Sequence, residues 1–150
     1  MAAEAWILPV TDNPVDAAFW AATRQGRLLV QHCEACASHH FPPRVFCPGC
    51  HGPLAWVPAG ESGRIWSFVT VHPPLLPAYQ ALAPYRVVVV EPEGVPGIRM
   101  IGNLLTTPDA DIGASRDTAI AIGDRVRLCF RQLTEDVTLP CWIRISSKEN

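Results

Sequence analysis

Two short stretches decide how this chain folds: Cys33-Glu34-Ala35-Cys36 and, ten residues further on, Cys47-Pro48-Gly49-Cys50. Each Cys-x-x-Cys turn can present two sulfurs to one metal ion, and the segment between the turns is long enough to bring them face to face. Pro48 and Gly49 favour the tight bend that the second turn requires. The spacing predicts a zinc ribbon with one structural zinc ion per chain, held by Cys33, Cys36, Cys47 and Cys50.

Composition limits what else a chain of 150 residues can contain. Hydrophobic residues make up 49% of it and charged residues 17%, which is enough apolar material for a packed core. The formal net charge of −2 argues against a strong binder of nucleic-acid phosphates. No apolar run is long enough to span a membrane, and residues 1–10 lack the basic cluster of a signal peptide. Six cysteines without an export signal indicate a cytoplasmic protein, since thiol pairs in that reducing compartment more often hold metal than form disulfides.

The residues before the cysteine turns predict one helix and one short strand. An N-cap at Asn13 and a stop at Gly26 favour a helix over 13–26. Its apolar positions fall on one face, at Val15, Ala18, Phe19 and Ala22. Trp20 lies beside that stripe, either at the edge of the core or in contact with a partner subunit. Residues 27–32 are typical of a strand that leads into the first turn.

After the ribbon the pattern changes to that of strands. We expect five of them, over 64–71, 85–91, 99–105, 125–132 and 139–145. Five short strands after a ribbon favour a small Greek-key barrel of the OB type, with an open five-stranded sandwich as the alternative. The expected fold is therefore mainly β, with an N-terminal helical segment (1–30), a rubredoxin-like zinc ribbon (31–58) and a five-stranded OB-type barrel (59–150).

Alternation along two of these strands predicts which side chains face the core. In 64–71, Trp66 and Phe68 share one face, and the other face holds Ile65, Val69 and Val71. In 125–132 the inward set is Val126, Leu128 and Phe130. The outward set is Arg125, Arg127, Cys129 and Arg131. Cys129 is accordingly expected at the barrel surface or an interface, and Cys141 in the core.

Several stretches of the chain match the motifs of a known family. They are Phe19-Trp20, 26–36, Phe41-Pro42-Pro43-Arg44, 47–50, 63–71, 84–88 and 122–126. The chain resembles the acyl-CoA-associated zinc-ribbon/OB-fold proteins, and the resemblance covers nearly its whole length. The four cysteines combined with Phe41-Pro42-Pro43-Arg44 are its specific part. One departure is Ala37, where many members carry glycine, which would tighten the first turn without abolishing metal binding.

The resemblance implies an accessory subunit of an acyl-CoA-processing complex. Family members assemble with thiolase-like enzymes, and sometimes with hydratase-like ones, and the barrel can help form or shield the acyl-CoA path. Some such pairs act as aldolases on steroid side-chain CoA thioesters or as polyketide-type acyltransferases. The connection 72–84 is unusually apolar, so it either folds onto the barrel or meets a partner. The residues expected to contact a partner are Trp20, Phe41, Arg44, Leu76 and Tyr79.

The remaining residues give no reason to expect independent catalysis. Four thiolates leave a zinc ion no open position for water or substrate. His32 and His51 flank the cysteine turns as alternative ligands, and a redox role of the thiol pairs is a further alternative. His39 and His40 are expected to be polar surface residues rather than a catalytic base. No Gly-x-Ser-x-Gly motif or Gly-rich phosphate loop occurs in the sequence.

Three arginines on one strand form a predicted basic ridge: Arg125, Arg127 and Arg131. Arginine can grip the phosphates of CoA bidentately, so these residues are candidate CoA contacts. The alternative is a solvated face whose arginines pair with acids such as Glu135 and Asp136. The same ridge supports a rival function, the binding of single-stranded nucleic acid, which needs a positive groove with stacking aromatics. The negative net charge disfavours that rival.

Overall fold

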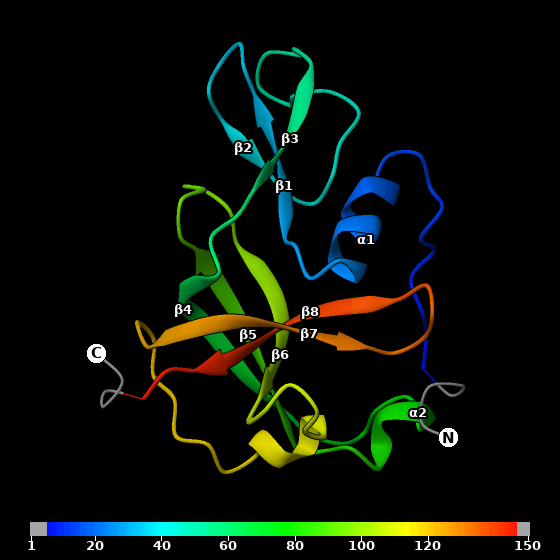
Figure 1. The fold of residues 1–150 in the computed structure, drawn as a ribbon. Helices are drawn as coiled ribbons and strands as arrows, with labels where there is room; N and C mark the ends of the chain where they lie inside the picture. The colour runs from blue at the N-terminus through cyan, green and yellow to red at the C-terminus, as the bar shows by residue number, and fades with distance from the viewer. Residues whose placement is uncertain (1–5, 147–150) are drawn as a thin grey trace.

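The computed structural model describes residues 6–146 and consists of a helix, a small ribbon sheet and a barrel (Figure 1). The elements before the barrel are α1 (Ala17–Arg24), β1 (Leu29–Cys33), β2 (His39–His40) and β3 (Leu54–Pro58). The barrel strands are β4 (Ser62–Val71), β5 (Tyr85–Pro92), β6 (Met100–Leu105), β7 (Arg125–Gln132) and β8 (Thr138–Arg144). Two short helices, α2 (Pro77–Gln80) and a 3-10 helix (Ile112–Ser115), lie in the long connections. No helix within 6–146 is long and apolar enough to cross a membrane.

Strand order confirms the predicted OB-type barrel and excludes the open sandwich. The strands follow one another around the barrel as β4-β5-β6-β8-β7, and β7 pairs back onto β4 to close it. All of these pairs are antiparallel except β6 with β8, which are joined in parallel at Leu104↔Trp142 and Leu105↔Ile143. The ribbon is a separate antiparallel sheet in the order β2-β1-β3. In Figure 1 this sheet stands above the barrel with α1 beside it.

The N-terminal helix is shorter than expected because a turn precedes it. The side-chain Oδ1 of Asn13 accepts a hydrogen bond from the Val15 N–H at 2.9 Å, and the Asn13 carbonyl accepts from the Asp16 N–H at 3.1 Å, which makes 14–16 a turn. The regular helix therefore begins only at Ala17. It ends at Arg24, and Gly26 follows with a left-handed φ of +69°.

A β-bulge changes the faces predicted for β4. Ile65 opposes Val90 and Ser67 opposes Val89, so Trp66 is the extra residue between them. The bulge reverses the alternation, which places Phe68 on the inner face with Ile65. The expectation that Trp66 and Phe68 share a face is therefore wrong, and Trp66 is 44% exposed.

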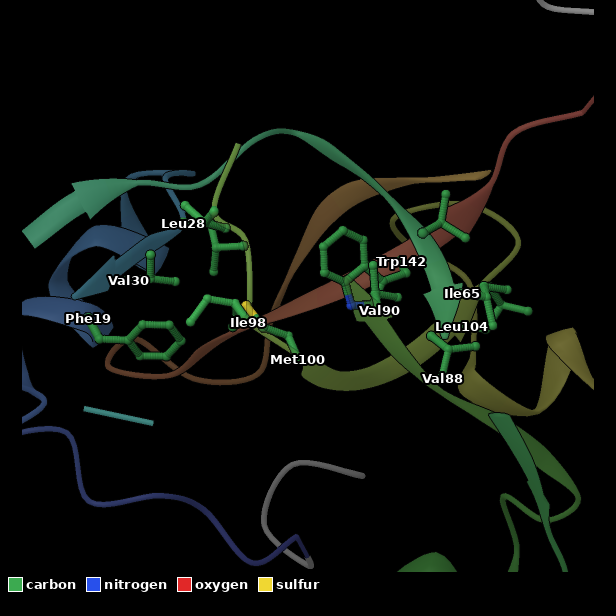
Figure 2. Packing of buried hydrophobic residues seen from close by; sticks show 12 residues of the cluster. Phe19, Leu28, Val30, Ile65, Val88, Val90, Ile98, Met100, Leu104 and Trp142 are labelled. Carbon is green, nitrogen blue, oxygen red and sulfur yellow. The ribbon is translucent and has the colours of Figure 1, made fainter. Parts of the chain in front are cut away.

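One hydrophobic core joins the ribbon end of the molecule to the barrel. Its buried residues are Phe19, Leu28, Val30, Ile65, Val88, Val90, Val95, Ile98, Met100, Leu104, Val126 and Trp142. Figure 2 shows Ile98 and Met100 between the first three of these and the barrel side chains around Trp142. Apolar side chains of the helix, the ribbon and the barrel thus pack against one another in a single core.

A second buried cluster covers the outside of β7 and β8. It contains Leu105, Ile112, Cys129, Cys141 and Ile143, with Leu82 and Trp6 packed against it. Cys129 is therefore buried rather than exposed, and burial raises the pKa of its thiol to about 11. The prediction of a surface Cys129 is wrong because the connections fold over the outward face of β7. That of a buried Cys141 is confirmed.

Replacing Phe19 with alanine tests whether the ribbon end and the barrel share one core. Removal of a buried phenyl ring should lower the free energy of unfolding by about 3–5 kcal/mol. In the metal-loaded chain we expect one urea transition, seen alike by tryptophan fluorescence and circular dichroism. Ala18→Ser, on the exposed side of α1, is the control and should change stability by less than about 0.5 kcal/mol. Two transitions, one of them unaffected by Phe19→Ala, would contradict a shared core.

Candidate functional site

Four cysteine sulfurs meet at the tip of the ribbon. The Sγ atoms of Cys33, Cys36, Cys47 and Cys50 all lie within 4.8 Å of one another. Across the two turns, Cys33 Sγ lies 3.4 Å from Cys50 Sγ, and Cys36 Sγ lies 3.6 Å from Cys47 Sγ. Four sulfurs arranged tetrahedrally at about 2.3 Å from a zinc ion would be about 3.8 Å apart. The cluster is thus positioned to bind one metal ion with all four ligands from the chain.

Each cysteine turn is closed by a residue with a left-handed backbone. Ala37 follows Cys36 with a φ of 57°, and His51 follows Cys50 with a φ of 60°. The turns are also tied at their bases, because the Cys33 N–H donates to the Ser38 carbonyl at 2.8 Å. The Cys47 N–H donates to the Gly52 carbonyl at 3.0 Å in the same way. Because glycine has no Cβ, it adopts a left-handed backbone without steric cost and therefore suits position 37 best.

The pKa values of the Cys47 and Cys50 thiols are shifted in opposite directions. The backbone N–H of Cys50 donates to the Cys47 sulfur and, against the effect of burial, lowers the pKa of Cys47 to about 5. The backbone N–H of Gly52 lowers the pKa of Cys50, but the neighbouring sulfurs, led by Cys33, raise it to about 12. Four thiolates at this separation repel one another unless a cation lies among them. The donor set therefore fits a divalent, thiophilic metal ion.

His40 is a residue of this site that sequence reasoning missed. Its Nε2 lies 3.3 Å from Cys47 Sγ and 2.7 Å from the hydroxyl oxygen of Ser38, which in turn lies 2.9 Å from Cys36 Sγ. His40 is brought there because β2 pairs with β1, and this two-residue strand has no periodic signal in the sequence. The alternative ligands His32 and His51 are not part of the sulfur cluster.

Buried Gln31 fixes the segment between the two cysteine turns. Its Nε2 donates to the Arg44 carbonyl at 2.9 Å, and its Oε1 accepts from the Arg44 N–H at 2.7 Å. This pair of hydrogen bonds holds the linker that carries Phe41 against β1. The Phe41 ring then packs on Phe19, with 5.3 Å between ring centroids, and Phe19 packs edge-on against Trp20 at 5.0 Å.

An apolar groove of about 280 Å³ opens where the helix, the ribbon linker and the barrel meet. Its walls are Phe19, Trp20 and Phe41 on one side, and residues 100–103 of β6 with Leu139 and Pro140 of β8 on the other. The groove lies where β6 has not yet paired with β8, because their ladder begins only at Leu104. Gly102 permits the close packing here, since a Cβ at this position would lie 3.0 Å from the Trp142 ring.

The five predicted contact residues fall on two separate parts of the surface. Trp20 and Phe41 line the groove, and Arg44 lies on the same linker. Tyr79 instead packs on Trp6, with 5.6 Å between ring centroids, at the opposite end of the barrel where α2 lies (Figure 1). Leu76 precedes α2 and is 57% exposed. The connection 72–84 thus folds onto the barrel through Leu82 while leaving Leu76 at the surface.

The arginines of the predicted ridge have different partners. Arg125 approaches Glu93 at 3.8 Å, whereas Arg131 is drawn towards the connection 106–118, where it lies 3.8 Å from Asp111. Arg131 also donates to the Ala110 carbonyl and lies over the Trp6 ring. The expected acids Glu135 and Asp136 are therefore not the partners of these two arginines. Arg127 is exposed between them.

Comparison with known proteins agrees with this architecture. Residues 20–56 match the family described as "ChsH2, rubredoxin-like zinc ribbon domain", and residues 56–131 match "ChsH2, C-terminal OB-fold domain". The chain belongs to the ChsH2 family. A solved structure described as "Ltp2-ChsH2(DUF35) aldolase" contains a chain that is 30% identical to the present chain and superposes on it with a TM-score of 0.73. That match covers 91% of this chain and 98% of the other.

Two further similar proteins differ in the information that they add. A protein of Thermomonospora curvata named "Probable enoyl-CoA hydratase alpha subunit" is 36% identical over 128 residues. The match covers 83% of this chain but only 36% of that relative's length. A DUF35-family protein of unknown function from Sulfolobus solfataricus has a TM-score of 0.57 at 12% identity, over 97% of this chain and 93% of its own. It supports the fold alone.

A pair of cysteine substitutions tests the metal centre. Cys47→Ser removes one of four ligands, and we expect the purified chain to lose its bound metal, measured by elemental analysis. Cys129→Ser changes another buried thiol outside the cluster and should leave about one metal ion per chain. Equal metal contents in the two variants would refute the ligand assignment.

The left-handed backbone at Ala37 provides a second test. Ala37→Gly relieves the steric cost of φ 57° and should stabilise the metal-loaded ribbon by about 1 kcal/mol, measured by urea unfolding. Ala35 lies in the same turn without a positive φ, so Ala35→Gly should give no gain. A destabilising effect of Ala37→Gly would show that this turn is not strained.

Proposed function

We propose that this chain is a non-catalytic, zinc-binding accessory subunit that docks on a thiolase-like enzyme and helps to bind or channel an acyl-CoA. The observation that carries the proposal is the likeness to one chain of the solved "Ltp2-ChsH2(DUF35) aldolase", which covers 98% of that chain. The family resemblance assigns thiolase-like character to such partners. Steroid side-chain or polyketide-type lipid metabolism in the cytoplasm is the corresponding setting.

The metal centre supports an accessory rather than a catalytic role. With Cys33, Cys36, Cys47 and Cys50 as ligands, a zinc ion would have a complete tetrahedral shell. A complete shell leaves no position at which water or a thioester oxygen can bind. The zinc ion would supply folding free energy to the ribbon, which has only three short strands of its own.

A hydratase-like partner is the second candidate. The Thermomonospora curvata relative is named as a hydratase subunit, and this chain corresponds to 36% of its length. The remaining part of that protein has no counterpart in this chain. A chain of this kind would then serve a hydratase-like enzyme.

Co-expression with candidate enzymes tests the proposed function. We expect this chain to elute in one size-exclusion peak with a thiolase-like enzyme, and to raise that enzyme's affinity for its acyl-CoA. A hydratase-like enzyme assayed in parallel serves as the comparison. If this chain elutes alone and changes the acyl-CoA affinity of neither enzyme, the proposal is wrong.

A further inference from the structure

The outer face of β4, β5 and β6 carries an uncovered apolar area. The bulge leaves Trp66 44% exposed, Val69 is 54% exposed, and Ile101 is 71% exposed. Ladder pairing places them near one another, because Val89 of β5 opposes both Ser67, next to Trp66, and Ile101. Contiguous apolar area of this kind on a folded chain marks an interaction surface.

This apolar area continues into the groove. Ile101 belongs to both, since it lies on the outer face of β6 and also lines the groove. The groove adds the side chains of Phe19, Trp20 and Phe41, so this wall is apolar. A large apolar side chain of a partner would therefore suit it.

A row of charged residues borders the apolar area. Arg125 opposes Arg64 across β7 and β4, and Arg64 opposes Glu91 of β5. Arg99 lies 3.3 Å from Glu91 and stacks on the Trp66 ring, 3.8 Å from its centroid. Arg64 and Arg125 place like charges directly opposite each other. Glu91 opposes Arg64, and Glu93 lies 3.8 Å from Arg125. The three arginines and two glutamates of the row leave one positive charge in excess, which favours a carboxylate on the partner surface.

We propose that this outer face, together with the groove, is the surface that docks on the thiolase-like enzyme. The groove receives one large apolar side chain from a partner loop, and the arginine row faces acidic residues of the partner. The inference rests on the proposed function and adds its location. A protein fits better than an acyl chain, because the groove is smaller than most ligand pockets while the apolar area extends beyond it over the outer face of the barrel.

Two matched isoleucines make the test. Ile101→Glu puts a charge at the mouth of the groove, whereas Ile7→Glu changes an isoleucine that is 72% exposed beside Tyr79, away from the groove and the arginine row. With the thiolase-like enzyme immobilised, we expect Ile101→Glu to raise Kd by at least about tenfold and Ile7→Glu by less than about twofold. Thermal unfolding and metal content of both variants should match the unmodified chain, which excludes misfolding as the cause.

The arginine row is tested by salt dependence. Arg64→Gln should weaken association at low ionic strength and flatten its dependence on salt. Arg116→Gln is the control. Arg64 donates to the Gly123 carbonyl and Arg116 donates to the Gly113 carbonyl, so each variant loses a similar hydrogen bond, but Arg116 lies outside the row. If the salt dependence of the Arg64 variant equals that of the control, the charged part of the proposal is wrong.

The outcomes separate the docking surface from the proposed function. Normal binding of the enzyme by Ile101→Glu would overturn the docking surface and leave the accessory role intact. Failure of the unmodified chain to bind would overturn both. Titration of the isolated chain with decanoyl-CoA distinguishes the other occupant, because saturable binding that Ile101→Glu abolishes would assign the groove to an acyl chain and refute the proposal.

Discussion

The convergence of four sulfurs at the ribbon tip is the constraint on which the upper half of this molecule depends. The strands around it are too short to stand alone, since β2 has two residues and β1 and β3 have five each. The sulfurs lie within 4.8 Å, a spacing that four thiolates tolerate only around a cation. The same constraint closes the two turns and sets the path of the linker that carries Phe41.

The ribbon acts on the barrel through shared packing. Leu28 and Val30 enter the same core as Trp142 (Figure 2). Phe41 lines the groove and packs on Phe19. A metal centre that has no contact with the groove therefore still determines one of its walls. This arrangement suits a platform whose shape must be fixed before a second protein arrives, because a preformed surface loses less conformational entropy on binding.

Sequence reasoning succeeded where a strong local pattern existed. Spacing identified the four cysteines, and strict alternation predicted β7 with both of its ends. It failed where tertiary packing decides the outcome. The bulge at Trp66 and the burial of Cys129 depend on neighbouring strands and connections, not on local periodicity. His40 contacts Cys47, 7 residues away, and Gln31 contacts Arg44, 13 residues away. No spacing rule predicts contacts of this kind.

Hydrogen exchange tests most directly whether the ribbon depends on a metal ion bound by the four sulfurs. The full chain is measured metal-loaded and after removal of the metal by a chelator. The account predicts that the amides of β1, β2 and β3 and of the linker between the cysteine turns lose their protection when the metal is removed. Unchanged protection of those amides would show that the ribbon holds its shape without the ion, and would contradict the account.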